Sequence, residues 1–140
     1  MSNSAASDFA VALAAANRAN EELLAGRAAA LQACFSHAQD ISLFGGFGGH
    51  EIGWAQIGPR LEWVAQTFAG GHCTYEPLSQ VIGADVALVV QLERGDFQLA
   101  DRTPPRRLGL RVTMVFRRED GVWRLVHRHA DPLLEKAAPR

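Results

Sequence analysis

The stretch Arg107–Ala130, RLGLRVTMVFRREDGVWRLVHRHA, decides the fold of this 140-residue chain. Two runs rich in β-branched and aromatic residues flank Glu119, Asp120 and Gly121. Such runs, separated by a short segment that ends in Asp-Gly, are typical of an antiparallel β-hairpin. The sequence therefore predicts two long neighbouring strands joined by a tight turn at residues 119–121.

The turn determines which side chains of the hairpin share a face. If residues 119 and 120 form a type I turn and the glycine at 121 is left-handed, Thr113 pairs with His127 and Arg111 with His129. Because side chains alternate along a strand, all four then project from one face and form the wall of a semi-polar pocket. A two-residue Asp-Gly turn would instead place Met114 opposite His127 and break this cluster.

The composition is that of an ordinary globular protein. With 140 residues, 48% of them hydrophobic, and a formal net charge of -1, the chain can bury a core without disulfides or metals. We expect one domain over residues 1–140, with residues 1–6 disordered. The basic residues are dispersed, which argues against nucleic-acid binding.

The two cysteines, Cys34 and Cys73, are expected to be free, because no partner spacing accompanies them. The N-terminus has no basic region ahead of an apolar stretch, so it does not match a signal peptide. No apolar run approaches the roughly 20 residues of a membrane span. We therefore expect a cytoplasmic protein that does not bind membranes.

Helices are predicted to come first and strands after. Helical apolar spacing covers residues 7–24, residues 27–40 and, after Trp54, a third helix up to the glycines at 70 and 71. The segment GGFGG at 45–49 matches neither nucleotide-binding glycine pattern and is expected to form turns. Extended segments follow at 72–82, 86–94 and 107–130. This order predicts an α+β fold in which helices cover one face of a curved antiparallel sheet, with a cavity at its open end.

The chain carries a series of short motifs: FGGFGG at 44–49, GW at 53–54, LEW at 61–63, FAGG at 68–71, RVT at 111–113, RR at 117–118, DGVW at 120–123 and VHRH at 126–129. Together these motifs resemble the SnoaL-like branch of the nuclear transport factor 2-like superfamily. The closing segment is also similar to the association domain of calmodulin-dependent kinase, which has the same fold. The resemblance implies a cone-shaped, cystatin-like α+β fold. The superfamily holds isomerases, cyclases, dehydratases and non-catalytic binding or assembly modules, so the function stays open.

The acids that ketosteroid isomerases of this fold use are missing at the corresponding positions. Alignment through the helix end places the base at Leu43 or Phe44, and the second acid at Thr113. None of these side chains carries a carboxyl group, which disfavours steroid isomerisation. His127 is then the best candidate for a catalytic proton carrier, since the unperturbed pKa of histidine is about 6.5. A structural histidine that holds the sheet together is the simpler interpretation of the same residue.

The rest of the expected pocket combines polar strand residues with aromatic side chains. These are Glu93, Arg111, Thr113 and His129, with Trp54 and Trp63 in the apolar wall. Arg111 could bind a ligand anion, or it could pair with Glu93. A zinc site would need ligands beyond the two histidines, so we expect no metal, and no cofactor is implied.

Two functional classes stay open. The first is a non-catalytic domain that binds a small organic molecule, and an Arg111 clamp would favour an anion. The alternative is an enzyme of the cyclase, isomerase or dehydratase type, with His127 as proton carrier and Arg111 as anion clamp.

A homodimer is also expected, because an apolar row on the face opposite Arg111 would need a cover, unless the twist of the sheet packs it into the core. The row consists of Leu110, Val112, Met114, Phe116 and Val126.

Overall fold

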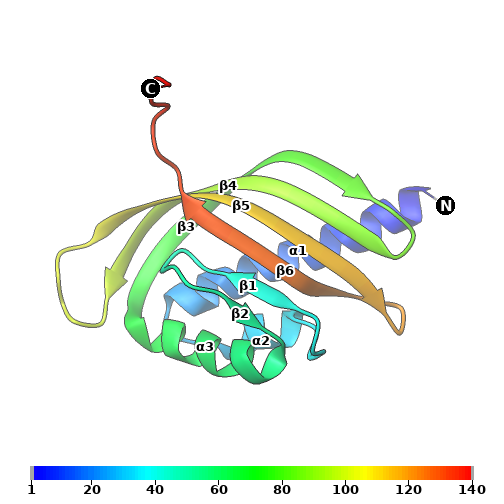
Figure 1. Cartoon of the computed structure of the whole chain (residues 1–140), viewed down its shortest axis with the longest axis horizontal. Coiled ribbons are helices and arrows are strands. Elements are labelled where there is room, and N and C mark those ends of the chain that lie inside the picture. Colours follow the sequence, from blue (N-terminus) through cyan, green and yellow to red (C-terminus); the bar gives the residue numbers. More distant parts are fainter. Residues whose placement is uncertain (1, 140) are drawn as a thin grey trace.

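The structure, a computed structural model, describes residues 2–139, with side chains from residue 8 onward. Within this range the chain forms three helices and six strands (Figure 1). The helices are α1 (Ser2–Leu24), α2 (Ala29–Cys34) and α3 (Trp54–Thr67). The strands are β1 (Ser42–Phe44), β2 (Glu51–Ile52), β3 (Phe68–Ile82), β4 (Val86–Leu99), β5 (Arg106–Glu119) and β6 (Val122–Pro132).

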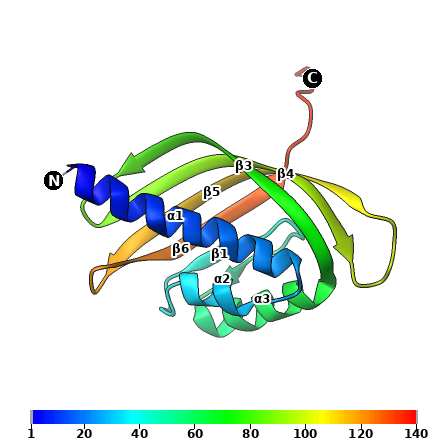
Figure 2. The same cartoon turned by 180° about the vertical axis from the view of Figure 1, so that it is seen from behind.

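The strands form one curved sheet in the order β2-β1-β6-β5-β4-β3. β1 runs parallel to β6, and the other neighbouring strands are antiparallel. Figure 2 shows α1 lying across one face of the sheet, and Figure 1 shows β4, β5 and β6 from the opposite side, which none of the helices in residues 2–139 covers. The predicted α+β fold, with helices on one face of a curved sheet, is confirmed.

Helix α1 buries an apolar stripe against the sheet. Phe9, Leu13 and Leu23 are buried, at spacings that bring them to one side of the helix. The ring of Phe9 packs edge-on against that of Phe116, with the centroids 5.0 Å apart. The helix begins at Ser2, so residues 2–6 are helical in the structure, and residue 1 lies outside the described residues.

The β5–β6 turn differs from the predicted one. Asp120 and Gly121 have positive φ angles of 49° and 78°, and Glu119 pairs directly with Val122. Left-handed conformations at both central residues define a two-residue type I′ turn, which Asp-Gly favours and whose twist suits a hairpin. The predicted type I turn is therefore wrong.

A bulge in β6 shifts the register a second time. Val126 is the extra residue between the pairs 116–125 and 115–127. Beyond the bulge, Thr113 lies opposite His129, and Arg111 lies opposite Asp131. In each pair the β6 residue lies two positions further along than predicted. The predicted register is therefore wrong.

The alternation of β5 decides which side chains meet the helices. Val112, Met114 and Phe116 are buried in the core, each no more than 2% exposed. Arg111 and Thr113 therefore project from the opposite, outer face of the sheet, because side chains alternate along a strand. The apolar row that suggested a dimer surface is packed in the core instead, so the dimer argument built on that row is wrong.

Several boundaries also differ from those expected. α2 ends at Cys34 rather than near residue 40, β3 begins at Phe68 directly after α3, and β4 extends to Leu99. Proline has no backbone N–H to donate, so Pro77 within the extended segment 72–82 predicts an edge strand or a bulge. This prediction is confirmed, since β3 is an edge strand with a register shift between Pro77 and Ser79. Both cysteines are free, as expected. No helix among the described residues is long and apolar enough to cross a membrane, and the cytoplasmic location stays a prediction.

Candidate functional site

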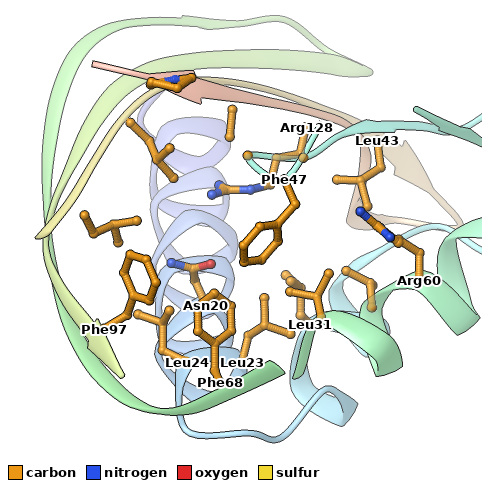
Figure 3. A pocket seen from close by; sticks show the side chains of 18 of the residues that line it. Asn20, Leu23, Leu24, Leu31, Leu43, Phe47, Arg60, Phe68, Phe97 and Arg128 are labelled. Carbon is orange, nitrogen blue, oxygen red and sulfur yellow. The ribbon is translucent and has the colours of Figure 1, made fainter. Parts of the chain in front are cut away.

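A cavity of about 290 Å³ lies between the inner face of the sheet and the helices (Figure 3). Its walls are mainly apolar and come from all three helices, several strands and the β1–β2 loop. They include Leu23, Leu31, Leu43, Leu61, Phe68 and Phe97. Ligand pockets have volumes of roughly 300–1,000 Å³, so this cavity suits a small molecule.

The β1–β2 loop, residues 45–50, forms one wall of the cavity. Phe47 reaches from it towards α3 and β3, where its ring centroid lies 6.0 Å from that of Trp63 and 5.7 Å from that of Phe68. Gly48 and Gly49 have positive φ angles, which only glycine adopts readily. The glycines therefore serve a chain reversal that brings Phe47 to the cavity, and the expectation of turns here is confirmed.

The buried end of the cavity is polar. Arg128 enters it from β6 and Asn20 from α1, and both side chains point into the cavity (Figure 3). Behind the cavity, Arg128 donates two hydrogen bonds of 2.8 and 3.0 Å to the carboxylate of Glu93. Gln91 donates a third bond to the same carboxylate, at 2.9 Å. The Glu93 side chain is 0% exposed, so these bonds replace those that water would make.

Two opposing effects act on the pKa of Glu93. Burial raises it, whereas the charge of Arg128 and the hydrogen bonds from Arg128 and Gln91 lower it. The lowering effects outweigh burial, so the pKa lies below its ordinary value of 4.5. Glu93 is therefore an ionised partner of Arg128 at neutral pH.

A second layer of hydrogen bonds fixes the polar end. The side-chain nitrogen of Asn20 donates to the hydroxyl of Tyr75 at 3.1 Å, and that hydroxyl donates to the main-chain oxygen of Asn17 at 3.0 Å. The side-chain oxygen of Asn17 accepts a bond of 3.1 Å from Gln91. One network thus joins α1, β3, β4 and β6 behind the cavity.

Two further arginines line the cavity. Arg60 of α3 lies 3.8 Å from Glu51, and its guanidinium carbon lies 4.2 Å from the ring centroid of Trp63. Arg107 of β5 is exposed. Among the described residues that line the cavity, Glu51 is the only one with a carboxyl group, and none is a histidine.

A family model described as the SnoaL-like domain matches residues 12–134, which is most of the chain. The chain belongs to the SnoaL-like family. This confirms the resemblance inferred from the sequence motifs. No curated protein matches the sequence.

Solved structures share the fold of this SnoaL-like domain. A nuclear transport factor 2-like superfamily protein from Salmonella enterica has a TM-score of 0.83 and 15% identity, covering 98% of this chain and 96% of that one. A ketosteroid isomerase-like protein from Erwinia carotovora atroseptica has a TM-score of 0.78 and 17% identity, covering 92% and 96%. A protein from Thiobacillus denitrificans, named for the association domain of calcium/calmodulin-dependent protein kinase type II, has a TM-score of 0.71 and 22% identity, covering 88% and 93%. At these identities the likeness shows the fold alone.

The predicted site residues of the SnoaL-like domain do not gather in the cavity. Arg111, Thr113, His127 and His129 lie on the outer face of the sheet, whereas Glu93 lies on the inner face. The expectation that they line one pocket beneath the helices is therefore wrong. The outward direction of these side chains has local causes. The core residues of β5 occupy the inner face, and the β6 bulge turns both histidines outward.

Arg111 is engaged by an acid on its own side of the sheet. Its guanidinium donates two hydrogen bonds, of 2.9 and 3.0 Å, to the two carboxylate oxygens of Asp131. The alternative pairing of Arg111 with Glu93 is wrong as well, since Glu93 binds Arg128 on the other face.

His127 connects β6 with β1. Its Nδ1 lies 2.7 Å from the hydroxyl oxygen of Ser42, and its ring packs edge-on against Phe44 with the centroids 5.1 Å apart. Burial, followed by the charge of neighbouring His129, lowers the pKa of His127 below its ordinary value of 6.5. These contacts match the interpretation of His127 as a structural histidine.

The two tryptophans expected in the cavity wall lie outside it. Trp54 stacks on His37, with the ring centroids 3.7 Å apart, and packs against the edge of the core. Trp63 is about half exposed and reaches the cavity only through its contact with Phe47. Among the described residues, no group of three or more His, Cys, Asp or Glu is placed to hold a metal ion.

Sequence reasoning missed Asn20, Gln91 and Arg128. One signal was present, because Gln91 and Glu93 interrupt an apolar strand at alternate positions. Two polar side chains on one buried face require hydrogen-bond partners, which predicts a buried network. The predicted register also places Arg128 on the face of Val112, but that face is expected from the sequence to form a dimer surface rather than to meet the helices, so the inward direction of Arg128 is not predicted.

Proposed function

We propose that this SnoaL-like domain binds a small, mainly apolar organic molecule in the cavity. The observation that carries the proposal is the shape and chemistry of the cavity, with apolar walls and two polar side chains, Asn20 and Arg128, at its buried end. Small-molecule sites have this character, since apolar walls supply affinity and a few polar groups orient the ligand.

The lining favours binding over catalysis. A general acid or base must lie within hydrogen-bond reach of its substrate. Glu51 is the one carboxyl group that the described residues contribute to the lining, and it lies beside Arg60, while Glu93 is fully buried in its pair with Arg128. The alternative enzyme would need His127 and Arg111 in one cavity, and no contact in the structure favours that arrangement.

Filling the cavity should weaken binding. Val64 lines the cavity from α3, so Val64→Phe puts a larger side chain into space that a ligand needs. With 2-naphthol as the probe, we expect the dissociation constant from isothermal titration calorimetry to rise about tenfold or more, which is roughly 1.4 kcal/mol.

Val11→Phe is the matched control, because Val11 is 69% exposed on α1 and does not line this cavity. It should bind 2-naphthol as tightly as the wild type does. Equal affinity of the wild type and Val64→Phe would place the ligand elsewhere and refute the proposal.

We also propose that the protein forms a homodimer through the outer face of the sheet, which no helix covers (Figure 1). The support is a half-buried apolar strip there, made by Leu88, Val90, Leu92 and Val115. Val90→Glu puts a charge into this strip, so sedimentation velocity should give a dimer for the wild type and a 15.2 kDa monomer for the variant.

Val11→Glu, on an exposed part of α1, should leave the dimer intact. A wild type that sediments as a monomer at micromolar concentration would contradict the dimer.

A further inference from the structure

Asn20 presents a hydrogen-bond acceptor to the cavity. The Tyr75 hydroxyl has one hydrogen and two oxygen acceptors besides Asn20, the main-chain oxygen of Asn17 at 3.0 Å and a carboxylate oxygen of Glu21 at 3.3 Å. It therefore accepts from Asn20, which places the nitrogen of the Asn20 amide towards Tyr75. The amide oxygen, Oδ1, accepts no hydrogen bond from any described residue. In the described part of the chain, two side-chain atoms are inaccessible to solvent and lack a hydrogen-bond partner, namely Gln91 Oε1 and Trp123 Nε1. Asn20 Oδ1 is not one of them, so this oxygen is accessible.

Arg128 presents donors to the same end of the cavity. A guanidinium group has five N–H bonds. Two of them bind the oxygens of Glu93, and a third points to the sulfur of Met114, at 3.6 Å. The remaining N–H groups donate to no described residue and can bind a ligand in the cavity that Arg128 lines, and Figure 3 shows its side chain entering that space.

Two carboxylates, those of Glu93 and Glu21, already lie near the buried end of the cavity. Glu93 neutralises Arg128 through a two-oxygen contact. Glu21 adds a second carboxylate behind the network, where its oxygen lies 3.3 Å from the Tyr75 hydroxyl. A ligand carboxylate here would face the Asn20 oxygen and two acids, while Arg128 is already paired with Glu93, and burying a charge without its own partner is unfavourable.

A donor and an acceptor that line the same cavity select for a particular head group. A ketone could accept from Arg128 but would leave the Asn20 oxygen unpaired in a buried place, which is unfavourable. A hydroxyl or a carboxamide satisfies both residues at once. We propose, as an extension that rests on the proposed function, that the cavity selects an apolar molecule with a neutral head group. Asn20 and Arg128 hold this head group, which both donates and accepts a hydrogen bond.

Four probes with the same ring system test the head group: naphthalene, 2-naphthol, 2-naphthamide and 2-naphthoate. Isothermal titration calorimetry on the wild-type protein should rank 2-naphthol and 2-naphthamide about tenfold or more tighter than naphthalene, because each makes two extra buried hydrogen bonds. They should exceed 2-naphthoate by a similar factor, because its carboxylate has no donor for the Asn20 oxygen and buries an unpartnered charge. This ranking needs no variant and so does not depend on how a substitution folds.

Asn20→Leu then removes the acceptor at similar side-chain volume. It should weaken 2-naphthol about fivefold or more and leave naphthalene within about twofold. Equal wild-type affinities for naphthalene and 2-naphthol would overturn the head-group proposal while leaving the cavity as a binding site. Tightest binding of 2-naphthoate, unaffected by Asn20→Leu, would overturn it too and place an anion elsewhere in the cavity. Failure of all four probes to bind would instead overturn the proposed function on which it rests.

Discussion

Arg128→Met should lower the free energy of unfolding by about 3–5 kcal/mol, because it leaves the Glu93 carboxylate buried without its ion-pair partner. Glu93 is 0% exposed, so water cannot replace the two lost hydrogen bonds. Urea denaturation followed by tryptophan fluorescence measures the change. The double variant Arg128→Met with Glu93→Gln should recover part of the loss, since it removes the unpaired charge.

The matched control is Arg111→Met. Arg111 also makes a two-oxygen contact with an acid, but its side chain is 63% exposed and that of Asp131 is 37% exposed. Solvent-exposed ion pairs contribute about 0–1 kcal/mol, so this variant should be nearly as stable as the wild type. Equal destabilisation by the two arginine variants would contradict the assignment of Arg128 to the buried face.

The penalty in Arg128→Met should also depend on pH. In the wild type the pKa of Glu93 is lowered, so its stabilising contribution is present above the ordinary value of 4.5 and lost as the pH falls through the folded-state value. In the variant, burial acts without the arginine and raises this pKa, so the penalty is present at neutral pH and disappears as acid protonates Glu93. The stability gap between the two proteins should therefore be smaller near pH 5 than near pH 8, and a gap that does not change would contradict this explanation.

Gly95→Ala should destabilise the protein by about 3 kcal/mol or more, through a backbone clash between β3 and β4. A Cβ atom at Gly95 would lie 1.8 Å from the main-chain oxygen of His72 and 3.0 Å from the Cα of Cys73. These are backbone atoms of the paired strand, so relief requires the two strands to separate locally. Thermal and urea denaturation should both show the loss.

Gly109→Ala is the control for this substitution, because it is the same change in the neighbouring strand. Its Cβ would meet nothing closer than the Cβ of Leu133 at 3.7 Å, an ordinary contact. We expect its stability to lie within about 1 kcal/mol of the wild type. A Gly95→Ala variant as stable as Gly109→Ala would show that β3 and β4 do not approach each other as described.

The fold could be predicted from the sequence because several local signals agreed. Helical apolar spacing up to Thr67, followed by β-branched strands, fixes an α+β order with the sheet at the end. The Asp120-Gly121 turn marks the hairpin, and Pro77 marks the edge strand. These signals each depend on a few neighbouring residues, which is why they could be interpreted without the structure.

The candidate site could not be predicted, because it depends on which face of the hairpin the helices cover. The two-residue turn and the bulge at Val126 each shift the β5–β6 register by one position, and together they leave both histidines on the same face as Arg111, as the sequence predicts. That face is the outer one. The alternating buried row of Val112, Met114 and Phe116 is the better guide to the inner face.

A crystal structure of the protein with 2-naphthol tests the central claim, that the cavity is the binding site, most directly. We predict density for the naphthalene rings between Leu61 and Phe97, with the hydroxyl oxygen within hydrogen-bond distance of Asn20 Oδ1 and Arg128. Density for the compound on the outer face beside His127 and His129, with the cavity free of it, would contradict the claim.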